Sequence, residues 1–206
     1  GGAEPVFADI DETTCNVSVA SVERLVTSRT EAIMPVHYAG QVADMTGIMR
    51  VAEKHGLAVI EDSAETLGGL HQGKLAGTWG IGCYSFFPTK SITTGEGGML
   101  LTHDGSLARR VRSLIGHGID RSTYQREVAD KPWFRGASKV GYNFRMSNFQ
   151  AAMGLVQLSK LDEMNEKRRG LARSYNAQLS HLPDISLATE LPGNRHVFQM
   201  YTIKVR

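Results

Sequence analysis

Short apolar runs alternate with helical patterns over the first third of the chain. The runs at residues 6–10, 31–37 and 57–60 predict strands. Between them, apolar side chains recur at helical spacing after Ser18 and after Asp44, and both residues are good N-caps. Strands that alternate with helices indicate a mostly parallel sheet with helices on both faces, a three-layer α/β/α arrangement.

The remaining chain continues both kinds of pattern. Two strands and one helix are predicted, over residues 83–87, 99–102 and 107–114. Residues 117–142 are rich in charged and aromatic side chains and are expected to form a loop. The sequence SNFQ at 147–150 matches a capping box and opens a helical region to about Leu182, with Gly170 as the place where it would break. Prolines 183 and 192 then mark a linker.

Composition and charge favour an ordinary globular protein over nucleic-acid-binding or membrane proteins. The 206 residues suit one domain, or one domain and part of another, and 41% apolar with 21% charged residues is ordinary for a globular protein. A formal net charge of +2 gives no basis for binding nucleic acid or an anionic membrane, and no apolar run approaches the ~20 residues of a membrane span. The seven histidines show no metal-ligand spacing, and Cys15 and Cys83, far apart, fit a reducing compartment such as the cytoplasm.

The two ends of the chain predict that it is a piece of a longer protein. A Gly/Pro turn leads directly into a strand-like run at the start, and the chain stops within the apolar run HVFQMYTIKVR. Free termini usually lie in exposed polar segments instead.

One glycine motif suggests a nucleotide site. GGLHQGK at 68–74 matches the start of a phosphate-binding loop, which requires a Ser or Thr next and then a helix. Leu75 stands in that place, and AGTWG follows it, so a glycine-rich surface turn is favoured.

Asp62 and Lys90 form a more informative pair. Alone, each would be a helix cap or a solvated charge. Each follows a predicted strand, however, and open α/β sheets bind ligands beyond the carboxyl ends of their strands. An acid and a lysine at two strand ends suit pyridoxal phosphate, whose ring nitrogen the acid would hold while the lysine bonds the cofactor. Burial would favour the neutral amine that attacks a carbonyl.

Several further motifs make the resemblance specific. VIEDSAETLG and GTWGIGCYSFFPTKSITTGEGGML resemble the DegT/DnrJ/StrS-type sugar aminotransferases, pyridoxal-phosphate enzymes of fold type I. PVFADID, PVHYAGQVADM, HGIDR and GYNFRMSNFQAAMG match the same family in the same order. The resemblance implies a large cofactor-binding domain over residues 1–182, without its N-terminal part. Residues 183–206 would be a linker and the start of a small C-terminal α+β domain.

The resemblance also implies roles for single residues. Lys90 corresponds to the lysine that bonds the cofactor and moves the proton, and Asp62 to the partner of the pyridine nitrogen. Ala64 corresponds to the small residue on the ring face, and Ser85 to a ligand of the cofactor phosphate. Asn143 corresponds to an asparagine that reaches the phosphate of the neighbouring subunit in a homodimer, although its residue type suits a turn equally well.

The chain departs from the family at Glu65, where many members carry Gln or His near the phenolic oxygen of the cofactor. A carboxylate there would repel a phenolate unless it is protonated or paired, so Glu65 either tunes the cofactor or faces solvent. The family's phosphate loop and ring-stacking aromatic, which lie upstream, are not in this sequence.

The implied function is transfer of an amino group, from glutamate as donor, to a keto sugar attached to a nucleotide. Lys90 argues against the dehydratase branch of the family, which carries histidine there. Two alternatives stay open: a non-catalytic relative or inactive fragment, and a cofactor-free α/β binding module.

Overall fold

The computed structural model describes residues 2–119, 133 and 136–205. They form two compact units, one made of residues 1–101 with 149–206 and the other of residues 102–148.

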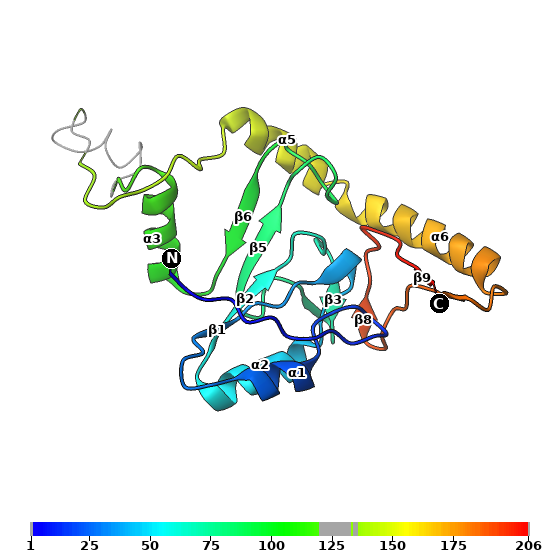
Figure 1. Ribbon diagram of the computed structural model, residues 1–206. Coiled ribbons are helices and arrows are strands. Elements are labelled where there is room, and N and C mark those ends of the chain that lie inside the picture. Colours follow the sequence, from blue (N-terminus) through cyan, green and yellow to red (C-terminus); the bar gives the residue numbers. More distant parts are fainter. Residues whose placement is uncertain (1, 120–132, 134–135, 206) are drawn as a thin grey trace. The chain divides into compact units, whose positions relative to one another are not determined.

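The larger unit is built on a four-stranded sheet of order β1-β2-β5-β6 (Figure 1). The strands are β1 (Ala32–Ile33), β2 (Ala58–Asp62), β5 (Ile81–Ser85) and β6 (Gly98–Leu101). β1, β2 and β5 run parallel, and β6 pairs antiparallel with β5. The predicted α/β class with a mostly parallel sheet is therefore confirmed.

Helices α1 (Val19–Leu25) and α2 (Met45–His55) lie side by side, and α2 packs against β1 and β2 (Figure 1). Both predicted caps are confirmed, because Ser18 accepts a hydrogen bond from the Ser21 amide and Asp44 accepts one from the Gly47 amide. Their apolar faces and the first strands form the buried core, which comprises Val22, Ile33, Val42, Ala43, Met45, Ile48, Val51, Ala52, Val59 and Ala76.

Two strand predictions near the start of the chain need correction. The strand predicted at 6–10 is wrong: Phe7 is 89% exposed, and among the described residues the run has only an isolated bridge from Ile10 to Val17. The strand predicted at 31–37 shortens to β1, because Pro35 has no N–H for the ladder. Only Val36 adds a bridge, to Asp62.

The GGLHQGK motif forms a β-hairpin. Strands β3 (Leu70–His71) and β4 (Lys74–Leu75) pair antiparallel, and Gln72 and Gly73 turn between them with φ of 49° and 77°. β8 (Asn194–Arg195) pairs with the other edge of β3. The interpretation as a surface turn is confirmed, since no helix follows to hold a phosphate.

The predicted long helical region consists of α5 (Asn148–Leu158) and α6 (Leu161–Leu179). It breaks at Ser159 and Lys160, so the break expected at Gly170 is wrong. Gly170 continues α6, at a cost of about 1 kcal/mol relative to Ala. Short segments complete the unit: η1 (Tyr38–Gly40), β7 (Ile185–Ser186) and β9 (Lys204–Val205).

The smaller unit contains α3 (Gly105–Ile115), the helix predicted at 107–114, which Asp104 caps. Most of the predicted loop 117–142 lies outside the described residues. Among the helices that are described, none is long and apolar enough to cross a lipid bilayer.

Candidate functional site

The carboxyl ends of two neighbouring strands define the candidate site. β2 ends at Asp62 and β5 ends at Ser85, and Asp62 stands opposite Cys83 in the parallel register. The two residues therefore lie at the same edge of the sheet, the edge at which the sequence predicted Asp62 and Lys90.

Lys90 lies in the loop between β5 and β6. Two backbone hydrogen bonds within the loop stabilise it. The Lys90 amide donates to Phe87 O and the Thr94 amide donates to Phe86 O, both at 3.0 Å. Gly95 and Gly97 have φ of 77° and 156°, which favour glycine, and they let the chain return into β6.

Glu65 is the ionic partner of Lys90. Lys90 Nζ lies 3.5 Å from Glu65 Oε1, and both side chains are less than one-fifth exposed. Glu65 Oε2 accepts a hydrogen bond of 2.8 Å from the amide of Ala39, in a residue with φ of 57°. Of the two expectations for Glu65, a plain solvent-facing position is wrong: the side chain is anchored beside the lysine.

Asp62 and Ser85 retain hydrogen-bonding capacity. One oxygen of Asp62 accepts from the Ala64 amide at 3.1 Å, and the second oxygen has no protein donor among the described residues. Ser85 Oγ accepts from the Phe87 amide at 3.3 Å and keeps its own proton to donate. Ala64 is half-buried directly after this acid.

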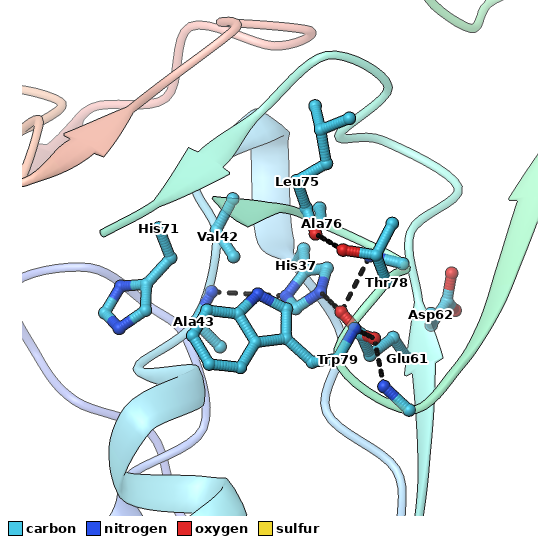
Figure 2. Close-up of polar contacts among 12 residues, drawn as sticks. His37, Val42, Ala43, Glu61, Asp62, His71, Leu75, Ala76, Thr78 and Trp79 are labelled. Atoms are coloured by element: carbon cyan, nitrogen blue, oxygen red, sulfur yellow. Dashed lines mark hydrogen bonds and ion pairs between the residues drawn. The ribbon is translucent and has the colours of Figure 1, made fainter. Parts of the chain in front are cut away.

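A second carboxylate, Glu61, lies next to Asp62 in β2 (Figure 2). Its side chain is fully inaccessible to solvent. Its Oε1 accepts from the amides of Trp79 and Gly80, at 2.7 and 2.8 Å. Its Oε2 accepts from the amide of Gly77 at 2.7 Å and from His37 Nε2 at 3.1 Å. All four acceptor positions of the carboxylate are therefore used.

The charge of Glu61 follows from these contacts. Burial by itself would raise the pKa of Glu61, but hydrogen bonds from His37, Gly80 and Gly77 outweigh it and lower that pKa, so the group is ionised. His37 Nδ1 accepts from the Ala43 amide at 3.2 Å, which leaves Nε2 as the ring nitrogen that donates to Glu61.

The two carboxylates affect the side chains of β5. Burial, followed by the negative charges of Asp62 and Glu61, raises the pKa of the Cys83 thiol. Burial and Glu61 together raise the pKa of Tyr84 to about 12. Cys83 is therefore protonated at neutral pH, which excludes it as a thiolate nucleophile in this site.

The sequence pattern did not identify Glu61 and its four N–H donors as part of the site. The signal that could have found it is the alternation of β2, since Glu61 shares the buried face with Val59. An acid on the buried face of a strand requires hydrogen-bond partners.

Gln199 and Met200, near the C-terminal end of the described residues, contact the segments that form the site. The side-chain amide of Gln199 donates to Thr89 O at 2.7 Å, directly before Lys90. The amide of Met200 donates to Ala39 O, the residue that holds Glu65. The segment therefore supports both the lysine loop and the turn that anchors its partner.

Asn143 is the one predicted site residue in the other unit. It is exposed and forms an isolated bridge with Gly116. Its contact with the cofactor of a neighbouring subunit stays a prediction.

Together, an amine, a paired carboxylate, an acid and a hydroxyl gather at one sheet edge. This α/β unit, with a lysine and an acid at the ends of parallel strands, has the fold of the large domain of fold type I pyridoxal-phosphate transferases. The chain belongs to the DegT/DnrJ/EryC1/StrS aminotransferase family, whose sequence profile matches residues 1–206. The resemblance found in the sequence is confirmed.

Named relatives agree with this assignment. The chain is 43% identical over 211 residues to GDP-perosamine synthase of Caulobacter vibrioides, with 99% of this chain and 53% of the relative covered. It is 38% identical over 205 residues to the spore coat polysaccharide biosynthesis protein SpsC of Bacillus subtilis, with 99% and 53% covered. The chain thus spans about half the length of these relatives.

Solved structures show the same fold. S. venezuelae DesV superimposes with a TM-score of 0.88 at 32% identity, over 99% of this chain and 52% of that chain. Helicobacter pylori PseC, an aminotransferase involved in the biosynthesis of pseudoaminic acid, superimposes with a TM-score of 0.91 at 29% identity, over 100% and 53%.

Proposed function

We propose that the full-length protein is a pyridoxal-phosphate-dependent aminotransferase that transfers an amino group from glutamate to a nucleotide-linked keto sugar. The observation that carries the proposal is the placement of Lys90, paired with Glu65 at 3.5 Å, in the loop that follows Ser85, while Asp62 ends the adjacent strand. The names of the relatives support amino-sugar biosynthesis, for surface polysaccharides or antibiotic sugars, as the setting.

The chemistry of these side chains fits pyridoxal phosphate. Asp62 has a free carboxylate oxygen to receive the pyridine N–H, and Ser85 has a free hydroxyl proton to donate to the phosphate. Ala64, next to Asp62, is small enough to leave room for a ring face. When bound, the cofactor supplies the electron sink that stabilises negative charge on the carbon that loses a proton.

Lys90 and Glu65 would have different roles at the bound cofactor. Lys90 would be the residue that bonds the cofactor, and its amine would hold and return the proton of the donor carbon. Glu65 accepts a hydrogen bond from the Ala39 amide and lies 3.5 Å from Lys90 Nζ, so its carboxylate is already paired before it would meet a phenolate.

The oligomeric state and the cellular compartment are part of the same proposal. The enzyme would be a homodimer in which Asn143 reaches the neighbouring subunit's site. The free cysteines, Cys15 and Cys83, support a reducing, cytoplasmic compartment.

The test uses the full-length protein with pyridoxal phosphate. We expect the absorbance band of a cofactor bonded to lysine, and loss of that band when glutamate is added. Lys90→Ala should abolish the band. A wild-type protein without the band would be a cofactor-free binding module, and a band that glutamate leaves unchanged would indicate a non-catalytic relative. A panel of nucleotide-linked keto sugars then identifies the acceptor.

A further inference from the structure

We propose that Glu61 is a positioning residue of this site, whose buried carboxylate holds the two segments that flank Asp62 and so fixes the acid and the lysine loop for the cofactor. This inference rests on the proposed function. Glu61 itself reaches no substrate, since its side chain is completely buried.

The first segment held by Glu61 leads into β5. The amides of Gly77, Trp79 and Gly80 all donate to the carboxylate. β5 begins at the next residue and ends at Ser85. A Cβ on Gly80 would collide with the backbone of Val59, so this segment lies directly against β2. The carboxylate therefore sets where β5 starts relative to β2.

The second segment runs from Pro35 to Gly40. His37 donates its ring proton to Glu61, and its backbone amide donates to Asp62 O at 3.0 Å. Two residues later, the Ala39 amide holds Glu65, the partner of Lys90. One buried side chain thus connects the supports on both sides of Asp62.

The role requires a carboxylate. Four N–H donors, the His37 ring and three backbone amides, converge on two oxygens. A glutamine at position 61 would direct an NH₂ group at two of these donors. At least one N–H group would then be left unsatisfied in the interior, and the segment that carries it would move.

The experiment compares Glu61→Gln with Glu163→Gln in the full-length protein. Glu163 is an exposed carboxylate on α6 that pairs with Lys167 at 2.7 Å, so its variant removes an equal charge away from the site. We expect Glu61→Gln to weaken pyridoxal phosphate binding at least tenfold, about 1.4 kcal/mol, in an absorbance titration. The pH at which the cofactor band changes should also shift. Glu163→Gln should match the wild type in both measurements.

Two further variants complete the test. Glu61→Asp keeps the charge and should recover part of the lost cofactor affinity. His37→Leu removes the ring donor but leaves the three backbone amides on Glu61, so it should fold even where Glu61→Gln does not, and it should also weaken binding. Wild-type affinity and an unchanged pH profile in folded Glu61→Gln, or in His37→Leu where Glu61→Gln does not fold, would overturn the inference. Absence of the band in the wild type would refute the proposed function instead.

Discussion

Replacing Gly82 with alanine tests how tightly the segment before β5 is packed. Gly82 is the second residue of β5, and a Cβ there would lie 2.5 Å from Gly77 Cα and 2.6 Å from Gly77 C. Carbon atoms normally approach to about 3.5–4.0 Å. Gly77 would therefore have to move by about 1 Å, in a direction that its own backbone contacts restrict.

The energetic cost follows from what Gly77 holds. Its amide donates to Glu61 at 2.7 Å, and a displacement of about 1 Å would take that bond out of hydrogen-bonding range. Loss of a bond to a charged group costs about 1.5–3 kcal/mol, and overpacking costs about 1–3 kcal/mol. We expect Gly82→Ala to lower the free energy of unfolding by about 3–5 kcal/mol.

Thermal unfolding, followed by circular dichroism at fixed concentration without cofactor, measures the effect. Each kcal/mol corresponds to about 2–4 °C in a chain of 150–250 residues, and to less in a longer one. Gly170→Ala in α6 is the matched control, because its Cβ would meet only the Arg173 side chain, at 3.7 Å, and it should raise the midpoint. A Gly82→Ala protein that melts together with the wild type would show that the segment yields to the methyl group, and the reasoning would fail.

Two other predictions concern a buried histidine and the phosphate ligand. Burial lowers the pKa of His196 to about 4 from an ordinary 6.5, so the unfolded chain gains a proton before the folded one does. The stability from this group should be complete above pH 6.5 and fall by roughly 3 kcal/mol as the pH decreases to 4. His196→Gln should remove that part of the pH dependence in urea unfolding; an unaltered profile would contradict it. Ser85→Ala should weaken pyridoxal phosphate binding about tenfold, from loss of one bond to a charged group. The cofactor-free midpoint should change little, because the bond that Ser85 Oγ accepts from the Phe87 amide is exposed. Equal affinity in titrations of both proteins would remove Ser85 from the phosphate site.

Much of the larger unit could be predicted from local patterns. Ser18 and Asp44 predicted the starts of α1 and α2, because a helix cap depends on residues that are close in sequence. Asp62, Ser85 and Lys90 could be placed at one edge because parallel strands bring their carboxyl ends together.

The errors and omissions arise where long-range contacts decide. The run at 6–10 has strand-like residues, yet a strand needs a partner edge, and the pattern carries no information about one. The break between α5 and α6 lies at Ser159 and Lys160, although the weak helix former is Gly170. Glu61 obtains its donors from residues 37 and 77–80, which approach it only in the folded chain.

The contact between Gln199 and Thr89 has a consequence for how the chain folds during translation. The two residues are 110 positions apart, and a ribosome adds about 5–20 residues per second. For roughly 5–20 s after Lys90 is made, the residue that clamps its loop does not yet exist. During that interval the nascent lysine loop lacks its final support, and this corner of the protein can reach its mature form only after translation has passed residue 199.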